Sequence, residues 1–64
     1  MNNTEMRAYM KGLAMAGNYS SKLIKAAKIN MTKYQLFRLE RVDLTAGELT
    51  ALQAVLVAAG LYDE

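Results

Sequence analysis

The sequence predicts an all-α fold, a compact domain of four short helices. The chain has no proline and is rich in Ala, Leu, Met and Lys, residues that favour helices. Apolar side chains recur at helical spacing in four segments, with capping or turn residues between them. Sixty-four residues allow one domain, so we expect residues 1–64 to form a single unit whose small core would benefit from a partner subunit.

The first helix is expected from about Glu5 to Ala16, with Thr4 as its N-cap. Gly17-Asn18 supplies left-handed residues that end a helix. Its inward side follows helical spacing and comprises Met6, Met10, Leu13 and Gly17, with Tyr9 at the edge.

The second helix is expected from a cap at Ser20 or Ser21 to about Ile29. Its inward face comprises Leu23, Ala26 and Ala27, with Ile24 as a further candidate. Lysine recurs at every third position on the opposite side, at Lys22, Lys25 and Lys28. A lysine row of this kind is more often a solvated face than a binding site, so its meaning depends on what lies beside it.

A turn at Ile29-Asn30-Met31 should separate the second helix from the third, because Asn tolerates the left-handed conformation. Thr32 and Gln35 form a capping box, which predicts a third helix from Lys33 to about Arg41. Leu36 and Leu39 are expected to point inward. Tyr34 and Phe37 then lie among cations, where they either fill the edge of the core or contact a partner.

The fourth helix is expected to follow a second capping box, formed by Thr45 and Glu48. Gly60 should end it, with Leu61 packing back on the helix. Its apolar stripe comprises Leu49, Leu52, Val55, Leu56 and Ala59. This helix carries almost no charge, which leaves Val57 available for a dimer contact.

Charge is concentrated in the middle of the chain. Residues 22–41 hold six of the eight basic side chains and one acid, a net +5, whereas residues 42–64 carry −4. Such polarisation favours an anionic partner. A basic amphipathic helix that lies on a membrane is an alternative interpretation of this charge, but the capped turn argues against one continuous helix.

The residues that are missing exclude several classes of function. Without His or Cys the chain has no thiolate zinc site and no obvious general base, so we expect no enzyme, no cofactor, no metal and no small-molecule substrate. No stretch approaches the ~20 apolar residues of a membrane span, and no signal-peptide pattern opens the chain. We therefore expect a cytoplasmic, non-enzymatic protein.

The region of the two central helices resembles the Cro/C1-type (XRE-like) helix-turn-helix family of phage repressors. The resemblance spans about residues 18–61. It is carried by Ala26, Asn30, Met31, Thr32, Leu36, Leu39 and Glu40 in order. It implies a lambda-repressor-like fold in which the second and third helices form the helix-turn-helix. The usual turn glycine is replaced by Asn30, and the family's fifth helix is missing.

This resemblance implies a repressor of phage or mobile-element type that reads the major groove of double-stranded DNA with the third helix, as a homodimer. Arg38 is the leading candidate for a bidentate contact to guanine. The implied base contacts are Lys33, Tyr34, Phe37, Arg38 and Arg41. The implied phosphate contacts are Lys22, Lys28 and Thr32. The alternative is a helical protein-interaction module, such as an antirepressor, antitoxin or inhibitor, built on the same body.

Overall fold

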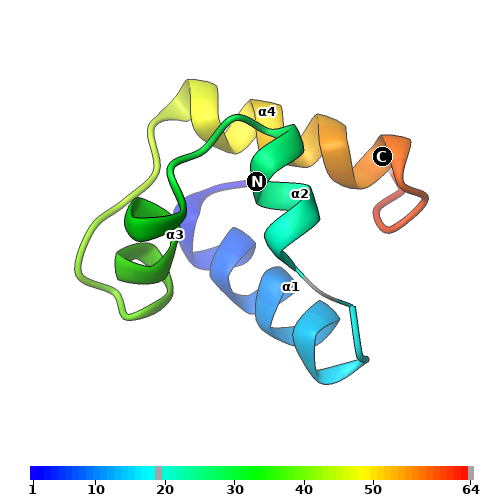
Figure 1. Ribbon diagram of the computed structural model, residues 1–64, viewed down its shortest axis with the longest axis horizontal. Coiled ribbons are helices and arrows are strands. Elements are labelled where there is room, and N and C mark those ends of the chain that lie inside the picture. Colours follow the sequence, from blue (N-terminus) through cyan, green and yellow to red (C-terminus); the bar gives the residue numbers. More distant parts are fainter. Residues whose placement is uncertain (19, 64) are drawn as a thin grey trace.

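Four helices make up the computed structural model, which describes residues 1–18 and 20–63 (Figure 1). They are α1 (Asn3–Met15), α2 (Ser20–Ala26), α3 (Met31–Arg38) and α4 (Ala46–Ala58). The described residues contain no strand, so the predicted all-α class is confirmed. The predicted cap at Ser20 or Ser21 is wrong in position, because α2 already includes Ser20.

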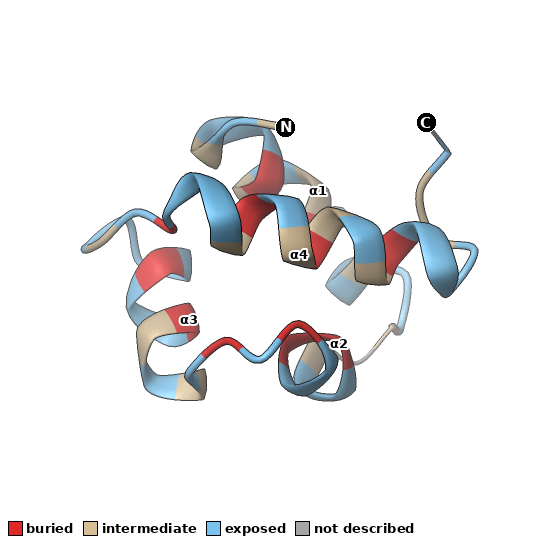
Figure 2. Ribbon diagram, turned by 90° about the horizontal axis from the view of Figure 1, so that it is seen from above, coloured by how far each residue is buried: buried red, intermediate tan, exposed pale blue. Residues whose placement is uncertain are grey.

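The core lies where α2 meets the other three helices. α2 packs against α1, α3 and α4, and the buried surfaces of α2, α3 and α4 face one another (Figure 2). The buried side chains are Met6, Met10, Leu23, Ile24, Ala27, Ile29, Tyr34, Phe37, Leu44, Leu49, Leu52 and Leu56. The predicted inward faces of the first and fourth helices are largely confirmed. On α2 the expected Ala26 is exposed, whereas Ile24 is fully buried.

The N-caps of α1 and α3 lie two residues earlier than predicted. Asn2, not Thr4, caps α1, in a capping box with Glu5. Asn30, not Thr32, caps α3, because the Lys33 backbone N–H donates to its side chain at 3.1 Å. The capping box of Thr45 and Glu48 at α4 is confirmed.

All four helices end in the same way. After each, one residue with positive φ closes a Schellman motif, in which two backbone N–H groups bond to carbonyls of the last turn. Glycine fills this place after α1 and α4, at Gly17 (φ 88°) and Gly60 (φ 72°), as predicted. After α2 and α3 it is filled by Lys28 (φ 58°) and Glu40 (φ 59°).

The left-handed residue between α2 and α3 is therefore Lys28, and the prediction of Asn30 was wrong. The Ile29 N–H returns to the Ile24 carbonyl at 3.1 Å, which turns the Ile29 side chain into the core. α2 then ends at Ala26 rather than Ile29, and α3 spans Met31–Arg38 rather than Lys33–Arg41.

The buried and exposed faces of α3 are the reverse of those predicted. Tyr34 and Phe37 are buried, 2% and 0% exposed, whereas Leu36 and Leu39 are 39% and 67% exposed. The predicted inward pair, Leu36 and Leu39, is therefore wrong. Both pairs have the same i, i+3 spacing and lie on opposite sides of the helix, so the spacing alone does not decide which of them points inward.

Arg7 ties α1 to the C-terminal end of α3. Its guanidinium donates to the Phe37 carbonyl at 2.7 Å, to the Val42 carbonyl at 2.8 Å and to the Asp43 carboxylate at 2.8 Å. It also lies 4.5 Å from the centre of the Phe37 ring. One turn earlier on α1, the Asn3 amide exchanges two hydrogen bonds with the Leu44 backbone. The connection from α3 to α4 is thus held against α1 at two points.

We predict that Arg7→Ala lowers the free energy of unfolding by roughly 2–3 kcal/mol, because it leaves two carbonyls without their charged donor. Urea unfolding measures this change. Lys11→Ala, one turn further on α1 and exposed, is the matched control and should stay within about 0.5 kcal/mol of the wild type. Equal effects of the two substitutions would contradict the role given to Arg7.

The position of the α3 cap makes a second prediction. Asn30→Ala should cost about 1 kcal/mol of stability, since it removes the side-chain acceptor at the N-terminus of α3. Thr32→Ala, inside the first turn and exposed, should cost only a few tenths. Thermal or urea unfolding of both variants decides between Asn30 and Thr32, and the opposite order of stabilities would restore Thr32 as the cap.

Candidate nucleic-acid interface

The exposed side of α2 carries the lysine row. Lys22 and Lys25 lie on the helix, and Lys28 is the left-handed residue after it. All three side chains are exposed. Leu23, Ile24 and Ala27 hold the opposite side of this segment in the core. Burial of that apolar side fixes the rotation of α2, so the lysines are kept in water with their charges available.

The outermost stripe of α3 is uncharged. At 100° per residue, Thr32, Gln35, Leu36 and Leu39 share the side opposite Tyr34 and Phe37. All four are exposed. Of these, only Thr32 was expected to contact a nucleic acid. Gln35 had been interpreted as a capping residue, and Leu36 and Leu39 as core. Assignment of Tyr34 and Phe37 to the core would have placed all three on the surface, because they lie on the opposite side of the helix.

Lys33, one of the predicted base contacts, lies beside this stripe and is turned toward α4. Its Nζ donates to the Glu48 carboxylate at 2.6 Å, and the same oxygen accepts the Thr45 backbone N–H at 2.9 Å. The pKa of the Glu48 carboxyl is lowered, first by the hydrogen bond from Lys33 and then by that from Thr45. The ion pair joins the first turn of α3 to the first turn of α4.

Tyr34 and Phe37, also predicted base contacts, belong to the core and present almost no surface to a ligand. Their rings lie 5.9 Å apart. Burial raises the pKa of the Tyr34 hydroxyl, against a hydrogen bond with Ser20 and the charge of Arg38, which both lower it. The aromatics therefore fill the core, and the interpretation of them as a contact surface is wrong.

Arg38 and Arg41 remain exposed, as the prediction requires. Arg38 is the last residue of α3, and its charge acts on the Tyr34 hydroxyl beside Ser20 at the start of α2. Arg41 follows Glu40 in the loop. Within residues 1–18 and 20–63 the ion pairs are Arg7–Asp43 and Lys33–Glu48. Among the described residues 22–41, the cations without an ion pair are Lys22, Lys25, Lys28, Arg38 and Arg41.

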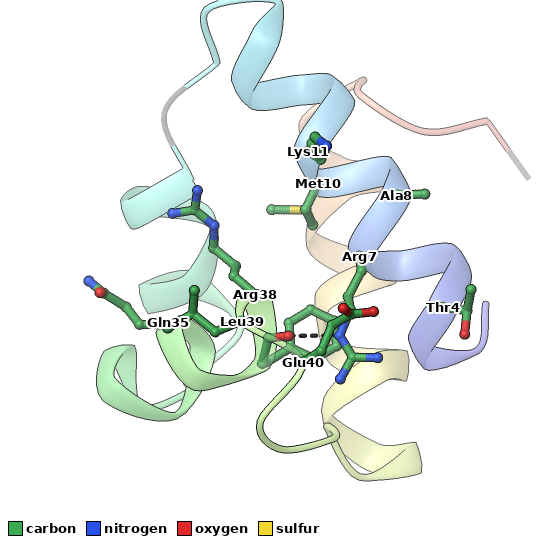
Figure 3. A pocket seen from close by; sticks show the side chains of 10 residues that line it. Thr4, Arg7, Ala8, Met10, Lys11, Gln35, Arg38, Leu39 and Glu40 are labelled. Carbon is green, nitrogen blue, oxygen red and sulfur yellow. Dashed lines mark hydrogen bonds between the residues drawn. The ribbon is translucent and has the colours of Figure 1, made fainter.

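Arg38 also lines a groove between α1 and α3 with a volume of ≈ 610 Å³ (Figure 3). From α1 come Thr4, Arg7, Ala8, Met10 and Lys11, and from α3 and its end come Gln35, Phe37, Arg38, Leu39 and Glu40. The described residues bring together no cluster of acids, Cys or His that could hold a metal ion. None of the described helices is long and apolar enough to cross a membrane.

Comparison with known proteins gives no relative: no family model, no curated protein and no solved structure matches this chain. The site is therefore interpreted from its own residues.

The Lys33–Glu48 pair predicts a pH dependence. Because the folded-state pKa of Glu48 lies below its ordinary 4.5, the pair adds stability above that value and loses it as the pH falls through the folded-state pKa. Urea unfolding at pH values from about 6 down to about 3 should show a steeper loss of stability in the wild type than in Lys33→Met. Parallel curves for the two proteins would show that Lys33 does not stabilise the Glu48 carboxylate.

Proposed function

We propose that the protein is a sequence-specific transcription regulator that binds double-stranded DNA, with α2 and α3 as its helix-turn-helix. The observation that carries the proposal is an exposed, uncharged stripe on α3 next to five cations that form no ion pair with any described residue. The connection between the helices supports it: residues 27–30 separate Ala26 from Met31, and turns of three to four residues are typical of this motif.

The proposed docking places the N-terminal half of α3 in the major groove, where the second helix of the motif reads base edges. Gln35 can pair with the N6 and N7 of adenine, and the Thr32 hydroxyl can bond to a base or to a phosphate. Leu36 can contact the methyl group of thymine, as apolar side chains do in this groove. Specificity then comes from neutral side chains.

Affinity comes from the cations. Lys22 and Lys25 on α2 and Lys28 just after it can contact phosphates, and Arg38 and Arg41 extend the positive surface at the other end of α3. The net +5 of residues 22–41 favours binding that weakens as salt rises. Because one copy makes few contacts, we propose a homodimer that reads two half-sites about one helical turn, ~34 Å, apart.

A second candidate, a helical protein-interaction module, is favoured by one observation. Leu36 and Leu39 expose 39% and 67% of their surface on the same face of α3. Exposed apolar pairs of this kind suit a protein partner as well as a thymine methyl group. The two functions differ in their dependence on salt, because phosphate contacts release counterions and apolar contacts do not.

Fluorescence anisotropy with labelled duplexes tests the proposal. One duplex comes from upstream of the protein's own gene and one is unrelated in sequence, each measured at low and physiological salt. We expect tighter binding to the own duplex, and Gln35→Ala should remove ~1–3 kcal/mol of that preference. Lys25→Ala should weaken binding to both duplexes alike and reduce the salt slope by about 1.

Thr32→Ala and Thr50→Ala form a matched pair of controls, since both threonines are exposed, one on α3 and the other on α4. Thr32→Ala should weaken DNA binding and Thr50→Ala should leave it unchanged. Weak binding to both duplexes without a salt dependence would refute the DNA-binding function and favour the protein-interaction module.

A further inference from the structure

The groove between α1 and α3 has a lining that DNA binding does not explain. Its exposed apolar side chains are Ala8 on α1 and Leu39 at the end of α3, of which Leu39 is 67% exposed, while the buried Met10 and Phe37 border its floor. A sugar-phosphate backbone offers no apolar counterpart to such a surface. With a volume of ≈ 610 Å³, the groove can accept several large side chains.

The charges at the groove are uneven. Arg7 is occupied by two carbonyls and the Asp43 carboxylate, so Lys11 and Arg38 are the cations available to a ligand. Glu40 is the one acid among the described residues that line it. Figure 3 shows Lys11 and Arg38 toward one end of the groove and Glu40 beside Arg7 toward the other. A ligand is therefore favoured if it places carboxylates beside Lys11 and Arg38 and apolar side chains over Leu39.

We propose that this groove binds an acidic amphipathic helix of a partner protein, and that this helix and DNA exclude each other. A trough between two helices with apolar walls suits the apolar stripe of a third helix, whose anchors recur at i, i+3, i+4 and i+7. Charge complementarity at the Lys11–Arg38 end selects an acidic partner over a basic one.

The mutual exclusion of the partner helix and DNA rests on the proposed function, and it follows from residues that both ligands would contact. Gln35, Arg38 and Leu39 line the groove and also belong to the exposed surface of α3. A helix seated over them occupies the side of α3 that DNA needs. The partner acts as a regulator that releases the protein from DNA by direct competition.

The probe is a labelled, capped peptide of roughly five helical turns, with leucine at i, i+3, i+4 and i+7 and glutamate elsewhere. Two control peptides accompany it: one with lysine in place of each glutamate, and one with the same composition but scrambled order. Anisotropy with the full chain should show binding of the acidic amphipathic peptide at least about tenfold tighter than either control. Equal binding of the scrambled peptide, or of the lysine peptide, overturns the proposal.

Variants locate the binding site. Leu39→Ala should weaken peptide binding about tenfold and Lys11→Ala about threefold, and both side chains are exposed, so the fold is preserved. Lys25→Ala, on α2 and outside the groove, should leave peptide binding unchanged. Amide shifts in NMR spectra should cluster on residues 4–11 and 35–40. If only Lys25→Ala weakens binding, or if the shifts lie on α2 or α4, the groove is not the site.

A competition arm separates this proposal from the DNA-binding function. Addition of the acidic peptide should release labelled DNA from the wild type, and Lys11→Ala should bind DNA normally yet need about threefold more peptide. If the peptide binds in the groove while DNA remains bound, mutual exclusion is refuted. If the peptide binds in the groove and no DNA binds at all, the proposed function fails and exclusion fails with it, whereas the partner site stands.

Discussion

The left-handed backbone at Lys28 is the constraint on which the rest of the structure depends. It closes the Schellman motif that ends α2 at Ala26, and the hydrogen bonds of that motif direct Ile29 into the core. α3 follows directly, with Asn30 as its N-cap and Met31 as its first residue. A lysine in this conformation costs stability that a glycine would not. The burial of Ile29, Tyr34 and Phe37 offsets this cost, because removing their apolar surface from water stabilises the fold by more than the left-handed lysine destabilises it.

Arg7 holds the C-terminal end of α3 in place. The final carbonyls of a helix lack partners within it, and a helix of eight residues has few bonds to lose. The Phe37 carbonyl accepts a hydrogen bond from the Arg7 guanidinium. It also accepts one from the Glu40 backbone N–H, which is part of the Schellman motif. The same guanidinium lies over the Phe37 ring, so one side chain holds both the backbone and the ring of Phe37 in place. This contact also sets the distance between α1 and α3, and thus the walls of the groove.

Where the sequence predicted the fold well, a residue type suited to a helix boundary stood there: a glycine that tolerates positive φ, or a threonine with a glutamate three residues later. Gly17 and Gly60 end α1 and α4, and Thr45 with Glu48 starts α4, as expected. The ends of α2 and α3 were misplaced because Lys28 and Glu40 occupy left-handed positions, and neither residue type indicates such a position in a sequence.

The error on α3 has one physical source. Asn30 was expected to be the left-handed residue and Thr32 the cap, although Asn is among the strongest N-cap residues and acts as one here. Leu36 and Leu39 were also expected to point inward, which left Tyr34 and Phe37 on the outer side. Two apolar pairs with identical spacing lie on opposite sides of this helix, so periodicity alone could not choose between them. The larger aromatic pair buries more surface, and it is the pair that the core contains.

The size of α3 connects the candidate site to the groove. Eight residues give a little more than two turns, so the inner side is used by Tyr34 and Phe37 and only a few positions remain exposed. Lys33 is held by Glu48 on one flank, and Arg38 lies on the other, at the rim of the groove. Any ligand that covers Leu39 and Arg38 therefore reaches Gln35, which lies three and four residues before them on the same side. A longer helix could carry DNA and a protein partner on separate turns. On this one the two proposed surfaces share residues, so the proposed competition is a consequence of the short helix.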